Sequence, residues 1–138
     1  MIAIDKARAQ IEIAKELLRN HAKPKDGLFQ NKKYVKKAGL TAYKGLFLLL
    51  VELLKEDSKG QKVIIEQDLF KLNKRIFADF ITAQQVLSKS RGVYGTRSQD
   101  LAKLGILEAE NIITWVEKCL NKRQKRAEML FKDMQTNY

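Results

Sequence analysis

Residues 32–55 read KKYVKKAGLTAYKGLFLLLVELLK, and the spacing of their apolar side chains decides the fold of this chain. Apolar residues recur there at intervals of three and four positions, namely Val35, Ala38, Ala42, Leu46, Leu49 and Leu53. This spacing predicts a helix with one buried face, for which Asn31 is a candidate N-cap. Further apolar residues between Leu46 and Val51 widen that face, so we expect this half of the helix to be central or to pack on a second surface.

Three other segments show the same helical spacing of apolar residues. The predicted helices cover residues 4–20, 63–88 and 99–120. The polar breaks between the helices lie at residues 23–27, 56–60 and 90–97. Short connections between long helices imply antiparallel neighbours. The predicted fold class is therefore all-α, an antiparallel four-helix bundle.

The C-terminal segment is set apart from the rest by its composition. Residues 1–120 are expected to form a single helical-bundle domain, since 138 residues is an ordinary size for one domain. Residues 121–138 begin with a basic run and continue with apolar residues at helical spacing. We expect this basic amphipathic extension to be helical, as a continuation of the last helix or as a fifth helix, or else to be frayed. Its apolar residues could seat in a partner's groove, although a solvated helix end is the simpler interpretation.

Charge is the unusual feature of the composition. The chain has 27 Lys and Arg against 16 Asp and Glu, a formal net charge of +11. Such a charge attracts nucleic acid, an anionic membrane or an acidic protein partner without specifying which of them. The longest apolar run, Leu46 to Val51, is far shorter than the roughly 20 residues of a membrane-spanning helix, so no membrane partner is expected.

The scarcity of cysteine and histidine limits the chemistry. The single Cys119 cannot form an intramolecular disulfide, and the single His21 cannot complete the usual zinc-site spacings. We therefore expect a cytoplasmic protein with no bound metal and no cofactor. His21 is interpreted as a cation at the end of the first helix, and Cys119 as an inert core thiol.

Four lysines gather at the start of the helix over residues 32–55. Lys32 and Lys36 lie one turn apart, as do Lys33 and Lys37, so their ammonium groups share one flank. Tyr34 lies among them and could stack on a base, as in proteins that bind single strands. These residues are a candidate nucleic-acid surface, whereas the ordinary alternative is the solvated face of an amphipathic helix.

Large apolar residues left over from the predicted core suggest a second kind of contact. We take Phe47, Tyr94 and Trp115 as candidates for self-association into a homodimer. The first functional hypothesis is accordingly a non-catalytic helical interaction module that associates with itself, and the second is a nucleic-acid-associated protein that uses the lysines.

Several short motifs resemble known proteins. Residues 34–46 (YVKKAGLTAYKGL) resemble the small-residue second helix of the higher eukaryote and prokaryote nucleotide-binding (HEPN) domains. More narrowly, the chain resembles an uncharacterised bacterial family of small helical proteins. The motifs that carry this resemblance are Lys33-Tyr34-Val35 with Ala38 and Ala42, Gly92-Val93-Tyr94-Gly95, Gly105-Ile106 with Ala109, and Ile113-Thr114-Trp115. The resemblance implies a HEPN-like bundle that pairs through helical faces near nucleic acid or a nucleotidyltransferase.

The same resemblance bears on catalysis. HEPN ribonucleases carry an arginine a few residues before a histidine near the start of the last core helix. Arg91 stands at a comparable place, but Thr96, Arg97 and Ser98 occupy the positions where the histidine should fall. Without an imidazole for proton transfer, no catalytic residue and no enzyme activity are expected. Arg91, Tyr94 and Arg97 are kept as a family-like loop, for which a degenerate ribonuclease is the third hypothesis.

Overall fold

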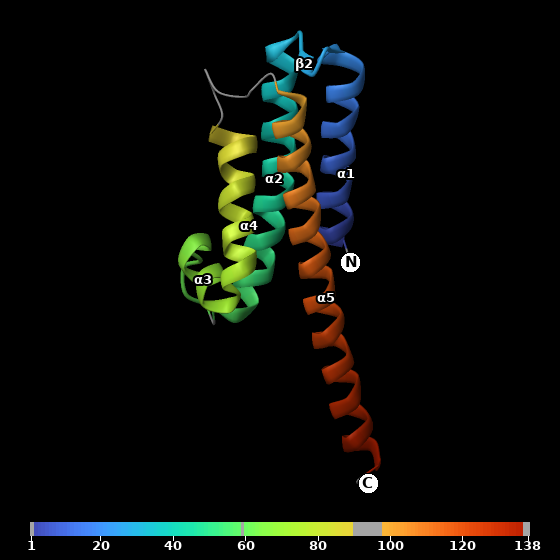
Figure 1. The fold of residues 1–138 in the computed structure, drawn as a ribbon. Coiled ribbons are helices and arrows are strands. Elements are labelled where there is room, and N and C mark those ends of the chain that lie inside the picture. The colour runs from blue at the N-terminus through green and yellow to red at the C-terminus, as the bar shows by residue number, and fades with distance from the viewer. Residues whose placement is uncertain (1, 59, 90–97, 137–138) are drawn as a thin grey trace.

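The computed structural model describes residues 2–58, 60–89 and 98–136, and almost all of them are helical (Figure 1). The elements, in chain order, are α1 Ile2–Glu16, a π-helical turn Leu17–His21, β1 Pro24–Lys25, β2 Leu28–Phe29, α2 Lys32–Asp57, α3 Ile65–Leu72, α4 Lys74–Gln84, a second π-helical turn Gln85–Lys89, and α5 Gln99–Thr136. The predicted all-α class is confirmed, with five α-helices in the described part of the chain.

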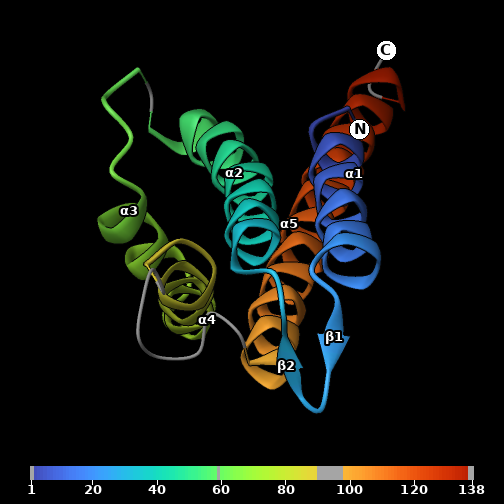
Figure 2. The ribbon, with the colours of Figure 1, turned by 90° about the horizontal axis from the view of Figure 1, so that it is seen from above.

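The four longer helices form an antiparallel bundle, and the short α3 lies beside its lower end (Figure 1). Seen from above, α1 and α4 lie on opposite sides of α2 and α5, which pack against each other (Figure 2). The stripe predicted for α2 is confirmed, because all six residues from Val35 to Leu53 are buried. Leu46 and Leu50 have 0% exposure and lie in the main core with Phe80 of α4 and Val116 of α5. The second half of α2 is therefore the centre of the fold.

One predicted helix is wrong in its extent. Residues 63–88 were expected to form a single helix, but Asn73 interrupts it with an extended backbone, φ −161° and ψ 108°. The Asn73 side chain accepts a hydrogen bond from the backbone N–H of Ile76 at 3.1 Å, so it ends α3 and caps α4. The apolar spacing continues through the break, with Leu69 and Ile76 both buried, and so gave no sign of it.

The break predicted at residues 23–27 contains a small hairpin. Pro24 pairs with Phe29 and Lys25 with Leu28 in antiparallel register. Asp26 and Gly27 form the two-residue turn with φ values of 53° and 80°, the type I′ geometry for which Asp-Gly is well suited. A hydrogen bond of 3.0 Å from the Gln99 N–H to the Gly27 carbonyl ties this hairpin to the start of α5.

The C-terminal segment up to residue 136 is part of α5 and not a separate helix. α5 is one helix of 38 residues, about 57 Å long, with no interruption at residue 120. The fifth helix of the bundle therefore comes from the break at Asn73. Figure 1 shows that the last turns of α5 continue past the ends of the other helices.

Close packing also shapes the middle of the bundle. A Cβ atom added at Gly39 of α2 would collide with the backbone carbonyl oxygen of Leu87. At Gly45 an added Cβ would lie 2.8 Å from Cβ of Gln10, a side chain on α1 that can adjust. The two glycines let α2 approach its neighbours on both sides.

Replacing Asn73 with alanine should destabilise the fold by about 1 kcal/mol, because the variant lacks the N-cap hydrogen bond of α4. The free energy of unfolding in urea, followed by circular dichroism, measures this change. Asn31→Ala is the matched control, since Asn31 occupies the N-cap position of α2 without a side-chain hydrogen bond there. Equal destabilisation in the two variants would contradict the capping role of Asn73.

Candidate interaction surfaces

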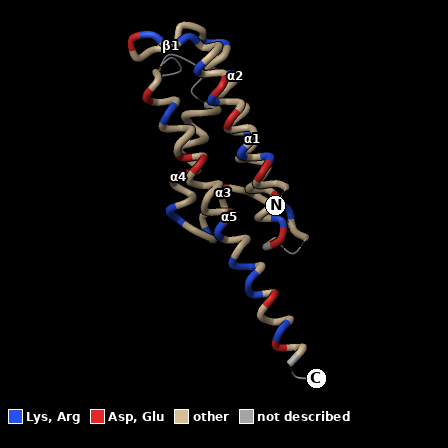
Figure 3. Tube along the Cα trace, turned by 90° about the vertical axis from the view of Figure 1, so that its right-hand side faces the viewer, with Lys and Arg blue, Asp and Glu red and all other residues tan. Residues whose placement is uncertain are grey.

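The first candidate surface is the part of α5 that leaves the bundle. Three ion pairs set the level of α5 against its neighbours: Lys15 with Glu110 at 3.1 Å, Arg8 with Glu117 at 3.3 Å, and Glu56 with Arg123 at 2.9 Å. Arg8 lies two turns from the start of α1, and Glu56 lies in the last turn of α2. α5 therefore passes the ends of both helices near Arg123, and about three further turns follow (Figure 3).

We call these last turns, residues 126–136, the α5 extension. They carry a strip of apolar side chains. Its four largest apolar residues are exposed, at 65% for Met129 and Leu130 and 61% for Phe131 and Met134. Ala127, Leu130 and Met134 continue the spacing of the buried residues Ile113, Val116 and, partly buried, Leu120. The face of α5 that fills the core inside the bundle therefore continues outside it with no described helix opposite.

A hollow lies where α5 leaves the bundle, between the ends of α2 and α3. Leu54 of α2 and Leu72 of α3 supply apolar walls, and Leu72 is 44% exposed. Lys71, Arg123 and Arg126 line the same hollow, Asp68 is the one carboxylate among its described lining residues, and Arg123 pairs with Glu56. This hollow, which we call the exit hollow, combines apolar surface with an excess of positive charge.

The residues predicted for self-association do not come together in the described structure. Phe47 is 41% exposed on α2 and lies against Tyr43, with 6.0 Å between the ring centroids. Trp115 is partly buried against the main core. Tyr94 lies outside the described residues, as do Arg91 and Arg97 of the family-like loop. The sequence pattern did contain the α5 extension, but its simpler interpretation there was a solvated helix end.

The predicted lysine patch is present at the upper end of the bundle. Lys32, Lys33, Lys36 and Lys37 are all exposed, and none forms an ion pair with a described carboxylate. A second hollow is lined by Lys32 and Lys33 together with Lys23 beside the hairpin. The ring of Tyr34 is stacked on His21 with 5.2 Å between centroids, so one face of the ring is already covered.

A pair of carboxyl groups lies between α4 and α5. The Oε2 atom of Glu108 is buried and accepts no hydrogen bond from the described residues. Burial raises the pKa of Glu108, and the nearby Asp79 raises it further, while Arg75 partly offsets both effects. Protonated Glu108 is therefore favoured in the folded state more than it is for an ordinary carboxyl group.

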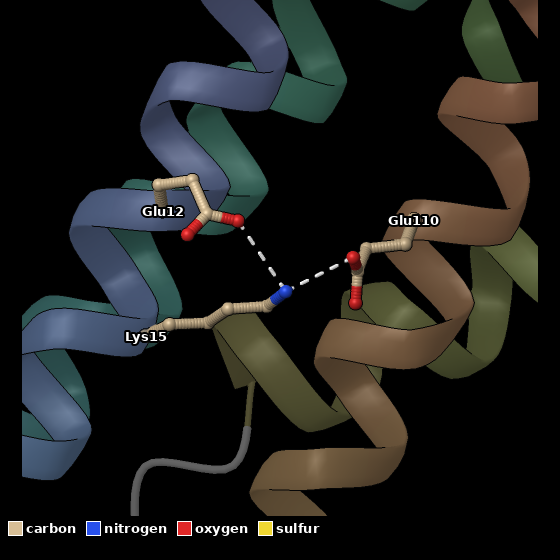
Figure 4. A network of polar contacts seen from close by, with 3 residues as sticks. All are labelled: Glu12, Lys15 and Glu110. Carbon is tan, nitrogen blue, oxygen red and sulfur yellow. Dashed lines mark hydrogen bonds and ion pairs between the residues drawn. The ribbon is translucent and has the colours of Figure 1, made fainter.

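Lys15 of α1 forms one ion pair with Glu110 of α5 and a second with Glu12 of its own helix. Lys15 donates to Glu110 at 3.1 Å and to Glu12 at 3.4 Å, as Figure 4 shows. The hydrogen bond to Glu110 raises the pKa of the Lys15 ammonium, and burial lowers it by less. These contacts align two helices and involve no group with unusual reactivity.

Other site types are limited in the described residues. No group of three or more His, Cys, Asp or Glu side chains there is placed to hold a metal ion. Every helix of the described part is too short or too polar to cross a bilayer. Cys119, predicted to be a core thiol, is only partly buried on α5. The α5 extension, the exit hollow and the lysine patch are three described surfaces that suit binding.

Glu108→Gln should stabilise the protein at neutral pH. The pKa of Glu108 is raised in the folded state, so its contribution to stability is fully present below the unfolded pKa and is lost as pH rises through the folded pKa. Glutamine removes that loss. Thermal unfolding at several pH values should therefore show a higher Tm for the variant at pH 7, with the difference shrinking on acidification. Glu110→Gln, which breaks the pair with Lys15, should lower the Tm slightly; a rise in both variants would contradict this assignment.

Comparison with known proteins places the chain in a family. Residues 2–118 match the model of a family described as a domain of unknown function (DUF5618). A solved structure, a protein of unknown function from Dyadobacter fermentans, is 32% identical with a TM-score of 0.73, and the match covers 86% of this chain and 95% of that one. No curated protein matches the chain. The family match ends before the α5 extension. The chain belongs to the family of domains of unknown function DUF5618.

Proposed function

We propose that this protein is a non-catalytic helical interaction module that associates with itself through the α5 extension. The observation that carries this proposal is the exposure of Leu130, Phe131 and Met134 along one side of a helix that has left its own bundle. Full burial of one such side chain stabilises a complex by roughly 1.5–3 kcal/mol. A contact that covers this strip on two copies therefore has a substantial driving force.

The helical state of the extension supports the same conclusion. An isolated helix shorter than about 12–15 residues is marginal in water, since helical stability in proteins comes mainly from packing of an amphipathic face. The α5 extension continues a packed helix and keeps an amphipathic pattern over its full length. A packing partner for this face would explain why large apolar residues occur at its helical spacing.

The absence of catalysis in this proposal rests on the sequence. We keep the HEPN-like assignment as the finer identity of the bundle, on the basis of residues 34–46, and in that superfamily the ribonucleases use a histidine that Thr96, Arg97 and Ser98 do not supply. We likewise propose a reducing, cytoplasmic environment from the single Cys119.

Leu130→Glu should convert a dimer into a monomer. Each copy would have one buried leucine fewer and would place a carboxylate in the contact, which should raise the Kd by more than about 100-fold. Size-exclusion chromatography with light scattering over a concentration series measures the change. Leu107→Glu is the matched control, since Leu107 is also exposed on α5, at 54%, but lies within the bundle. A wild-type protein that stays monomeric at high concentration would overturn the proposal.

The lysine patch supports a second candidate function, binding of nucleic acid. The specific observation is that Lys32 and Lys33 share a hollow with Lys23, so that cations from two segments of the chain converge without a described carboxylate to pair with them. Lysine ammonium groups at such a place can neutralise phosphates, and this kind of binding weakens as salt rises. The stacking of Tyr34 on His21 leaves one face of the tyrosine ring for a base.

Reversing the charge of Lys32, Lys33, Lys36 and Lys37 to glutamate should then weaken binding to single-stranded RNA by more than about tenfold. Each phosphate that the variant no longer neutralises should reduce the salt slope by about 0.7. Fluorescence anisotropy at several salt concentrations gives both quantities. The control reverses four other exposed lysines, Lys6, Lys44, Lys55 and Lys62. If the control weakens binding equally, the net charge is responsible and the patch is not a specific surface.

A further inference from the structure

We propose that the α5 extensions of two copies pack antiparallel, so that the tip of each enters the exit hollow of the other. The occupant of the exit hollow is thus a second copy of this chain, and the contact is the same on both copies. This inference rests on the self-association proposed above and specifies its geometry.

The first argument is continuity of the apolar surface. The strip of Ala127, Leu130 and Met134 runs up α5 towards Arg123 and there meets the hollow walled by Leu54 and Leu72. A second helix laid along the strip from its tip therefore reaches the hollow without leaving apolar surface. Leu72, which is 44% exposed, would be covered by it.

The second argument is the placement of charge beside the strip. Arg126 and Asp133 are seven residues apart, nearly two helical turns, and so lie on the same flank. When two such helices run antiparallel, the flank of one meets the same flank of the other. A register that places Arg126 opposite Asp133 of the second copy forms the pair twice by symmetry.

Nearly the same register matches the apolar residues. The apolar residues are matched when Ala127 lies opposite Leu130 of the second copy and Met134 lies opposite Arg123, where the exit hollow opens. Arg126 and Asp133 are then offset by two residues, about 3 Å along the helix, which their side chains can span. Asp133 then approaches a hollow lined by Lys71 and Arg126, and by Arg123, which pairs with Glu56 of its own chain. Asp133, near the end of one helix, therefore lies close to the positively charged side chains Lys71 and Arg126 of the other copy.

Parallel packing is disfavoured by the same charges. In a parallel pair, equal residues lie side by side, so the basic runs Lys122, Arg123, Lys125 and Arg126 of both copies would be adjacent. The two bundles would also lie at the same end of the paired helices and compete for space. The antiparallel arrangement places the two bundles at opposite ends of the paired helices. The helices then overlap over residues 121–136, which is about 24 Å of helix.

Charge-reversal variants of the full chain test this arrangement. Arg126→Asp alone and Asp133→Arg alone should each raise the Kd of the dimer by about tenfold, because two attractive pairs become two repulsive ones. The double variant Arg126→Asp with Asp133→Arg should return the Kd to within about threefold of the wild type. An equimolar mixture of the two single variants should form the mixed dimer in preference to either homodimer, as measured by native mass spectrometry. All three variants should keep the wild-type circular dichroism spectrum, since both positions are exposed.

The outcomes separate this inference from the proposed function. A wild-type monomer overturns both, including the case in which the monomer binds vesicles of anionic lipid through residues 126–136. A wild-type dimer that Leu130→Glu breaks, but in which the double variant is as weak as the single variants, overturns the antiparallel register and leaves self-association through α5 standing. A dimer that Leu130→Glu leaves intact places the contact on another face and overturns the role of the α5 extension.

Discussion

Burial of the leucine-rich half of α2 is the interaction on which the rest of the structure depends. Leu46, Leu49, Leu50 and Leu53 are at most 2% exposed, and they contact a core to which α1, α4 and α5 all contribute. Each of those helices presents only one apolar stripe, whereas α2 is apolar over a wider arc in this half. α2 can therefore be covered on several sides, and the other helices are arranged around it.

The ion pairs between helices contribute little to the stability of the bundle, but they help to position the helices relative to one another. The ion pairs of Lys15 with Glu110 and of Arg8 with Glu117 involve partly exposed side chains, and such pairs contribute about 0.2–1 kcal/mol each. Their effect is to select one level of α5 along α1. That level matters for the proposed self-association, because it determines how much of α5 lies within the bundle and how much extends beyond it.

The proposed self-association follows from the mismatch in helix length. α5 has 38 residues, whereas α1 has 15 and α2 has 26, so the bundle cannot cover α5 along its whole length. The uncovered turns carry apolar residues and two flanking charges of opposite sign, which suits a symmetric contact. The lysine patch lies at the opposite end of the bundle, beside the hairpin, so a dimer formed through α5 would leave both patches accessible.

The spacing of apolar residues was enough to predict the all-α class and the buried faces of the helices, because that spacing depends only on the helical repeat. The polar break predicted at residues 23–27 contains the turn at Asp26-Gly27, a dipeptide that tolerates positive φ. The spacing of apolar residues does not show where a helix is interrupted or which part of its apolar face is covered, and both depend on tertiary packing. The break at Asn73 was hidden because the stripe of Leu69 and Ile76 passes through it unchanged. The exposure of Leu130 was equally hidden, because a stripe shows which side chains share a face and not whether another helix lies opposite. That depends on where α1 and α2 end against α5, which packing between distant segments sets.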